Sequence, residues 1–140
     1  MEPELLRGDL IRSLGNIYRL EAFSALEALL QGESQTLLYL AEHREAAVYP
    51  SDLSRDLRLS RSRITGTLAA LRRKGLLAME ASQEDRRRIR VNITEAGLVL
   101  ILGQLKRMET YFDRMLAGLG HDDAKTLITL IDRCVAVMEE

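Results

Sequence analysis

The chain has 140 residues, of which 46% are hydrophobic and 29% charged, and its formal net charge is −1. This length and apolar content predict a single folded domain and exclude intrinsic disorder. The sequence has no ~20-residue apolar run, no positively charged leader and only one cysteine, so it predicts neither a membrane span nor a signal peptide nor an intramolecular disulfide. We therefore expect a cytoplasmic protein that makes no contact with a membrane.

Charge is unevenly distributed along the chain. Residues 55–90 hold eleven Arg and Lys and four acidic residues, a net charge of +7, whereas the remaining residues have a net charge of −8. A basic segment inside an acidic chain is typical of a surface that binds phosphates. This segment is therefore the candidate nucleic-acid-binding region.

The first predicted helix runs from Pro3 to about Gly32, because apolar residues recur at helical spacing from Leu6 onward. Gly8 and Gly15 within it each cost roughly 1 kcal/mol relative to alanine, so we expect a bend or a close helix contact there.

A second helix is predicted from Ser34, which suits its N-cap, to about Glu45. The residues predicted to face inward are Leu37, Leu40 and Ala41. Residues 48 and 49 should be extended, since a residue before proline is pushed away from helical angles and Pro50 follows.

Two further helices are predicted, the first from Pro50 or Ser51 to about Leu57 and the second from Arg61 to Lys74, joined by a short turn. Ser60 suits the N-cap of the second helix and Gly75 its end. Arg58 takes a turn position where glycine is usual, which predicts a strained or altered turn. The apolar residues placed for packing between these two helices are Leu53, Leu57, Leu59, Ile64, Leu68 and Leu71.

After Gly75 the apolar residues no longer recur at helical spacing but at every second position. Segments 77–80 and 88–93 are predicted strands, the second with Ile89, Val91 and Ile93 on one face, and the polar residues 82–87 form a hairpin tip. Thr94 suits the cap of a long helix that ends near Leu116.

The last predicted helix follows an interruption at Gly118 and Gly120. Asp122 and Asp123 place acidic side chains in its first turn, where the helix dipole favours them. Its apolar stripe consists of Leu127, Leu130, Ile131, Cys134 and Met138.

This order of elements predicts a mainly α fold with a small β-wing, a winged helix-turn-helix. In such motifs the N-terminal half of the second helix enters the major groove, where arginine can bridge the acceptors of guanine. The candidate DNA-binding residues on that helix are Ser60, Arg61, Ser62, Arg63, Thr65, Gly66, Arg72 and Arg73. For Arg72 and Arg73, stabilisation of the helix C-terminus through its dipole is an equally good explanation. Those in the wing, which could reach a minor groove or the backbone, are Asp85, Arg86, Arg87 and Arg88.

Residues 59–97 resemble the MarR (multiple antibiotic resistance regulator) family, in the runs 59–65, 71–77, 84–87 and 91–97. The family's wing signature, Asp-x-Arg followed by Thr-x-x-Gly, falls on Asp85, Arg87, Thr94 and Gly97. The resemblance implies a two-fold dimer on a pseudo-palindromic DNA site, usually a repressor, often released by a small anionic or phenolic ligand. It also implies that Arg87 enters the minor groove and that Asp85 holds its guanidinium.

The resemblance has two departures, Arg58 in the turn before the second helix and Gly66 within that helix. Many relatives carry a basic residue where this chain has Gly66, so base reading would rest more on Arg61 and Arg63.

Within the single domain, residues 1–32 and 98–140 are predicted dimerisation helices and residues 34–97 the winged helix-turn-helix. The terminal helices carry more apolar surface than a small bundle can cover, which favours a homodimer. A dimer would also place two recognition helices about one DNA turn apart.

Other interpretations weigh less. The winged helix could be a protein-interaction module without DNA binding, although such a module does not need the basic segment. Cys134 is interpreted as an inert core or interface thiol rather than a redox sensor. His43 and His121 are far apart, so neither a metal nor another cofactor is expected, and no nucleophile elbow or phosphate loop suggests an enzyme.

A small-molecule effector would fit a cleft between the dimerisation helices and the winged helix. Tyr18, Tyr111 and Phe112 could line that cleft, although helix packing is the commoner role of such aromatic residues. The sequence leaves open whether the protein represses or activates, which operator and gene it controls, and whether it binds an effector.

Overall fold

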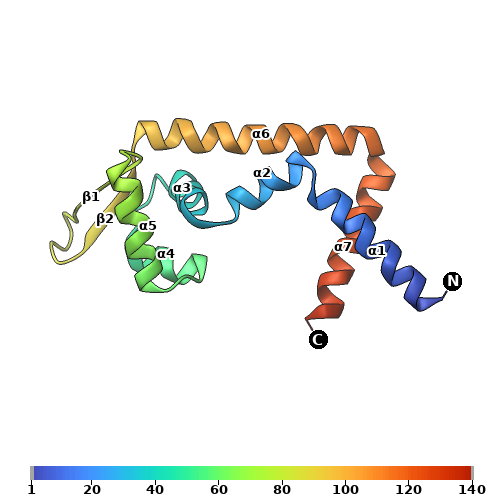
Figure 1. Cartoon of the computed structure of the whole chain (residues 1–140). Helices are drawn as coiled ribbons and strands as arrows, with labels where there is room; N and C mark the ends of the chain where they lie inside the picture. The colour runs from blue at the N-terminus through green and yellow to red at the C-terminus, as the bar shows by residue number, and fades with distance from the viewer. Residues whose placement is uncertain (1, 140) are drawn as a thin grey trace.

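The computed structural model describes residues 2–139, which form seven α-helices and one two-stranded antiparallel sheet. In chain order these are α1 (Pro3–Tyr18), α2 (Glu21–Leu29), α3 (Gly32–Glu42), α4 (Pro50–Leu57), α5 (Arg61–Arg73), β1 (Leu77–Ala81), β2 (Ile89–Ile93), α6 (Glu95–Leu119) and α7 (His121–Met138). Helix α6 runs along most of the molecule, with the two strands at its beginning and with α1 and α7 projecting near its end (Figure 1). We call α3 to β2 the winged unit, and α1 and α7 the arms.

The first predicted helix is in fact two helices. Leu20 has an extended backbone (φ −71°, ψ 145°) that ends α1 and begins α2, and the rings of Tyr18 and Phe23 pack across the turn at 5.4 Å. Helix α1 continues through Gly8 and Gly15, and a Cβ at Gly8 would meet nothing within 4 Å. Within residues 2–139, the single chain therefore has no close helix contact at these glycines, and its helix is interrupted further along the chain, at Arg19 and Leu20.

Ser34 does not cap α3. The helix begins at Gly32 (φ +53°), with Gln31 in the cap position, and ends at Glu42 rather than Glu45. The Ser34 hydroxyl instead donates to Oε1 of Gln104 in α6, at 3.0 Å. The predicted N-cap is wrong because a tertiary partner takes the hydroxyl.

The hydrophobic core lies inside the winged unit and beneath the first half of α6. Its largest fully buried side chains include Leu37, Leu40, Leu53, Ile64, Leu71, Val91 and Ile101. Leu57 and Leu59 pack against this cluster while partly exposed, which confirms the predicted contact between α4 and α5. Burial of each such side chain contributes about 1.5–3 kcal/mol, so this cluster supplies the main stabilisation of the winged unit.

The wing consists of β1, β2 and the connecting residues 82–88. Leu77 pairs with Ile93 and Ala81 with Ile89, so Ile89 lies toward the tip. The predicted alternation puts Val91 in the core, but Ile89 is 43% exposed because its end of the sheet extends beyond the core.

Helix α6 begins where Thr94 accepts a hydrogen bond from the Gly97 amide, at 3.1 Å, as its cap. A Cβ at Gly97 would lie 2.1 Å from the carbonyl oxygen of Leu76, so only glycine allows this close approach. The helix passes through Gly118 and ends at Leu119, three residues beyond the predicted end, and Gly120 (φ +85°) alone separates it from α7.

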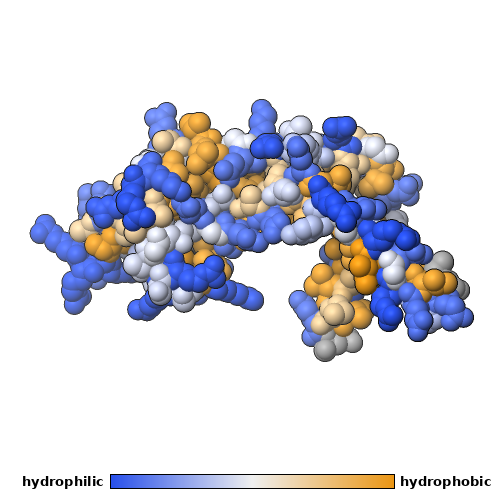
Figure 2. All heavy atoms as spheres, viewed as in Figure 1, coloured by the Kyte–Doolittle hydropathy of each residue, from blue (hydrophilic) through white to orange (hydrophobic). Residues whose placement is uncertain are grey.

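The arms leave their apolar faces exposed. Helix α1 buries no residue and α7 buries only Ala124. Leu6 and Leu10 are each 58% exposed, and Ile131 is 52% exposed. Apolar surface accordingly gathers on the projecting helices in Figure 2. Cys134 is exposed on α7, so it is not a core residue of the single chain.

No described helix has the length and apolar character required to cross a membrane.

Candidate nucleic-acid interface

The N-terminal half of α5, the recognition helix of the motif, forms an exposed polar surface. The Ser60 hydroxyl caps the helix by accepting from the Arg63 amide at 3.1 Å, as predicted. The Thr65 hydroxyl donates to the carbonyl of Arg61 at 2.8 Å, which leaves its methyl group for outside contacts. The side chains at the exposed positions of this half are Arg61, Ser62, Arg63 and Thr65, and Gly66 is exposed beside them.

The turn before α5 has a strained backbone, and hydrogen bonds from a neighbouring residue offset the strain. Arg58 adopts the left-handed conformation (φ 54°, ψ 44°), which costs a non-glycine residue roughly 1–2 kcal/mol. Ser54 offsets this strain, because its carbonyl accepts from the amides of Arg58 and Leu59 and its hydroxyl donates to the Leu59 carbonyl at 2.6 Å. Sequence reasoning predicted the strained turn but not the role of Ser54.

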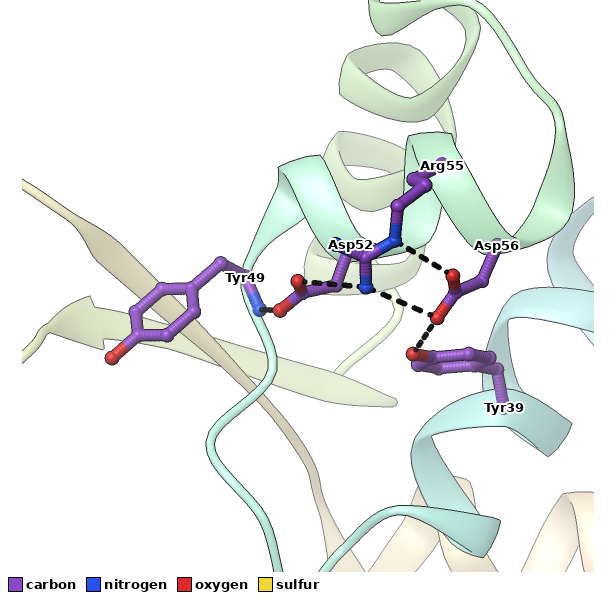
Figure 3. A network of polar contacts seen from close by, with 5 residues as sticks. All are labelled: Tyr39, Tyr49, Asp52, Arg55 and Asp56. Atoms are coloured by element: carbon purple, nitrogen blue, oxygen red, sulfur yellow. Dashed lines mark hydrogen bonds and ion pairs between the residues drawn. The ribbon is translucent and has the colours of Figure 1, made fainter.

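A network of charged and polar side chains joins α4 to α3 (Figure 3). Arg55 donates to Asp56 at 2.9 Å and to Asp52 at 3.3 Å, and the Tyr39 hydroxyl donates to Asp56 at 2.5 Å. Burial, followed by the hydrogen bond to Asp56, raises the pKa of Tyr39 to about 12. The hydrogen bonds from Arg55 and Tyr39 lower the pKa of Asp56 below its ordinary value.

The network separates two kinds of arginine in the basic segment. Arg55 has two carboxylate partners within its own helix. Among residues 2–139, no acidic side chain lies within 4.0 Å of Arg61 or Arg63. The cations at the start of α5 are therefore available to an anion from outside, whereas Arg55 mainly neutralises its neighbours.

The wing arginines point to different partners. Nε of Arg87 donates to Oδ1 of Asp85 at 3.3 Å, and the Arg87 side chain is 92% exposed. The guanidinium of Arg88 instead lies 3.6 Å from the centre of the Tyr49 ring, while Arg86 is exposed. The geometry thus gives Asp85 and Arg87 the contact that the family resemblance implied, and it gives Arg88 a partner in the body of the protein.

Sequence reasoning missed a buried connection between the wing and α4. The hydroxyls of Tyr49 and Ser82 lie 3.0 Å apart, and both residues are buried. The Val48 carbonyl also accepts from the amide of Val91 in β2, at 2.8 Å. The sequence predicted residues 48 and 49 only as an extended link, and they are extended in the structure. Because Ser82 begins a polar hairpin tip, the sequence around it did not indicate that its side chain is buried.

Arg72 and Arg73 lie at the other end of α5, separated from Arg61 by about 16 Å of helix. They line a groove of about 350 Å³ together with Pro50 and Met79. The structure therefore does not bring them together with the cations at the start of the helix.

Neither a metal site nor a complete aromatic cleft is formed by the described residues. Within 2–139, no group of three His, Cys, Asp or Glu side chains is placed to hold a metal ion, and His43 stacks on Tyr39. Tyr18, Tyr111 and Phe112 were the aromatic residues predicted as candidates for lining an effector cleft. Of these, Tyr111 lines a groove of about 480 Å³ between α2 and α6. Tyr18 packs on Phe23 instead.

Two crossed helices, an exposed basic helix start and a β-hairpin beside it define a winged helix-turn-helix protein. The MarR family profile matches residues 29–88, which cover α3 to the wing. The winged unit of this chain is therefore similar to the MarR family.

Comparison with individual proteins extends the likeness along the chain. The uncharacterized HTH-type transcriptional regulator YdgJ of Bacillus subtilis is 29% identical over 101 residues, which are 72% of this chain and 59% of YdgJ. The chain thus spans less than two thirds of the length of that relative.

Solved structures share the fold of nearly the whole chain. The YusO protein of Bacillus subtilis matches 97% of this chain and 99% of its own with a TM-score of 0.74 at 18% identity. MepR, a transcription regulator of the Staphylococcus aureus multidrug efflux pump MepA, matches 92% of this chain and 96% of its own with a TM-score of 0.71 at 18% identity. The likeness to these proteins is therefore one of overall fold.

Proposed function

We propose that this chain is a sequence-specific DNA-binding transcription regulator that acts as a homodimer on a pseudo-palindromic operator in the cytoplasm. The observation that carries the proposal is the exposed start of α5, where Arg61 and Arg63 have no acidic partner among the described residues. The free amides of a helix start favour phosphate, and arginine suits the guanine edge in the major groove.

The wing supplies the second proposed contact. Asp85 restricts the long side chain of Arg87 before binding, which lowers the entropy lost when the guanidinium enters a minor groove. A MepR variant, whose fold this chain shares with a TM-score of 0.66, has been solved bound to an oligodeoxyribonucleotide. That complex supports DNA as the ligand of this chain.

The arms supply the proposed dimer interface. Their exposed leucines, isoleucines and valines lie on helices that project from one end of α6 (Figure 1). Covering this surface with a second copy buries both sets of side chains and sets two winged units apart on one DNA face. A C₂ dimer matches the symmetry of a pseudo-palindromic site.

We further propose that the regulator is a repressor that a small molecule releases. The groove between α2 and α6 has a volume of about 480 Å³ and is lined by Leu20, Glu21, Tyr111 and Met115 among others. This volume suits an organic molecule of moderate size. MepR has been solved bound to ethidium bromide, which supports a ligand-responsive fold.

The proposal is tested by mobility shift on a duplex selected from random sequences by the purified chain. We expect a complex with two protomers and an affinity that falls about 10³-fold or more between 50 and 200 mM salt. Arg63→Ala and Arg87→Ala should each weaken binding about 10-fold or more.

Arg19→Ala is the matched control, because it removes the same charge at the junction of α1 and α2. Equal losses in all three variants indicate a general charge effect and refute the assigned contacts. Failure to select any sequence leaves the chain as a winged-helix protein-interaction module.

A further inference from the structure

We propose that Tyr49 is a positioning residue that fixes the wing, and with it Arg87, relative to the recognition helix. This inference rests on the proposed DNA-binding function. It stands on a set of contacts through which one buried residue joins α4 to both ends of the loop at the tip of the wing.

The backbone of Tyr49 is held by the first turn of α4. Its amide donates to Oδ2 of Asp52 at 2.9 Å, and its carbonyl accepts from the amides of Asp52 and Leu53 at 2.9 and 3.3 Å. Because Leu53 is fully buried against the core, this turn is fixed to the body of the winged unit. The backbone of Tyr49 is therefore held in place by the first turn of α4.

The Tyr49 side chain points away from this network, on the side of the wing strands (Figure 3). Its hydroxyl lies 3.0 Å from Oγ of Ser82, which is 4% exposed. Oγ of Ser82 also accepts from the amides of Glu84 and Asp85, at 3.3 and 3.4 Å. Ser82 therefore links the Tyr49 hydroxyl to two amides of the loop, whichever of the two hydroxyls donates.

Arg88, at the other end of the loop, contacts the ring of Tyr49. The guanidinium of Arg88 lies 3.6 Å from the ring centre of Tyr49, a cation–π contact. The amide of Ser82 donates to the carbonyl of Arg88 at 2.9 Å, which closes the loop. Tyr49 thus contacts the first and the last residue of the segment 82–88, and Arg87 immediately precedes the last.

Apolar packing cannot position this loop. From residue 83 to residue 89 no side chain is buried. The orientation of the tip therefore depends on polar contacts, and the buried contact with Tyr49 is the one that reaches the body of the winged unit. The pair formed by Asp85 and Arg87 sets the guanidinium relative to the loop, and Tyr49 sets the loop relative to α4 and α5.

The test is Tyr49→Phe in the full chain, which keeps the ring for Arg88 and removes the hydroxyl that shares a hydrogen bond with Ser82. In the free protein, we expect the amides of Glu84 and Asp85 to exchange about fivefold faster with solvent. On the selected duplex, the affinity should fall about fivefold. In an Arg87→Ala background the same substitution should change the affinity less than about twofold, because its effect acts through Arg87.

Tyr39→Phe is the matched control. It also removes a hydrogen-bonded tyrosine hydroxyl, but the partner of that hydroxyl, Asp56, lies in α4 and not in the wing. It should leave the exchange of both wing amides unchanged. If Tyr49→Phe reduces the yield of folded protein, Ser82→Ala breaks the same contact from the other side and should show the same dependence on Arg87.

Unchanged amide exchange in Tyr49→Phe overturns the proposal, as does an affinity loss of equal size with and without Arg87. Amide exchange needs no DNA, so it tests the positioning role even if the unaltered chain binds no duplex. In that case the proposed function fails separately.

Discussion

The winged unit and the arms use similar apolar side chains in opposite ways. In the winged unit, Leu53 and Leu71 are fully buried by neighbours from the same chain. In the arms, Leu10 on α1 and Ile131 on α7 are 58% and 52% exposed. The single chain therefore completes the core of one region and leaves the other with an uncovered apolar surface. The comparison indicates that the winged unit is specified within the chain, whereas the stability of the arms depends on what covers them.

The largest effect is expected from Gly97→Ala, at the junction of the wing with α6. The new Cβ would lie 2.1 Å from a backbone carbonyl oxygen, so either α6 or the segment before β1 must move. We expect a loss of about 4 kcal/mol or more in the free energy of unfolding, measured by denaturant titration. Gly103→Ala is the matched control, since its Cβ meets nothing within 4 Å, and it should stabilise the helix by about 0.5–1 kcal/mol. Similar results for both variants would refute the role of Gly97.

A direct comparison of the two regions uses Leu53→Ala and Leu10→Ala. Leu53 is 0% exposed and Leu10 is 58% exposed. At a protein concentration where the chain is monomeric, the first substitution should lower the free energy of unfolding by about 3 kcal/mol and the second by less than about 0.5 kcal/mol. Equal losses would show that the arms are folded against the winged unit of their own chain.

Ile131→Asp tests what covers the arms. A carboxylate in a two-fold interface is buried twice, so we expect the dimer to dissociate about 100-fold more readily, which corresponds to about 2.7 kcal/mol. Sedimentation over a range of concentrations measures the change. Asp132→Asn, on the neighbouring residue of α7, controls for a change of charge on this helix. A particle mass that is the same for Ile131→Asp and the unaltered chain at every concentration would speak against the interface.

The smallest effect concerns the polar network of the winged unit. The pKa of Tyr39 is raised from 10.0 to about 12, so the folded protein keeps a proton that the unfolded chain loses in this range. The contribution to stability is therefore present below pH 10 and lost as the pH rises toward 12, and for this solvent-screened hydroxyl it stays below about 1 kcal/mol. Absorbance at 295 nm should show one tyrosine titrating near pH 12, and Tyr39→Phe should remove that step. If Tyr39→Phe instead removed a titration step near pH 10, a raised pKa of Tyr39 would be ruled out.

Local signals made much of the winged unit predictable. Ser60, Thr94 and Pro50 mark helix starts through chemistry that acts within one turn, and the structure has helices at those places. The strands were also predicted, because β2 alternates apolar and polar residues over its whole length. These features depend on neighbours in sequence, so they can be read without the fold.

Contacts between distant segments were not predictable in the same way. Tyr49 and Ser82 are 33 positions apart, and the partner of Ser34 is 70 positions away. Their meeting depends on how α4, the wing and α6 are arranged, and no local pattern encodes it. Within the candidate site, the sequence could group Arg87 and Arg88 as wing cations, but only the loop geometry separates an exposed guanidinium from one stacked on Tyr49.

The length of α6 has a mechanical consequence. A continuous helix of 25 residues is about 37 Å long, and it carries the wing at one end and the arms near the other. In the proposed dimer, a rotation of α6 by about 5° about its end at the arms displaces its other end, which carries the wing, by about 3 Å. That displacement is close to the 3.4 Å between successive bases along a DNA strand. A change in the packing of the arms too small to alter the fold could therefore move the recognition helices out of register with their two half-sites.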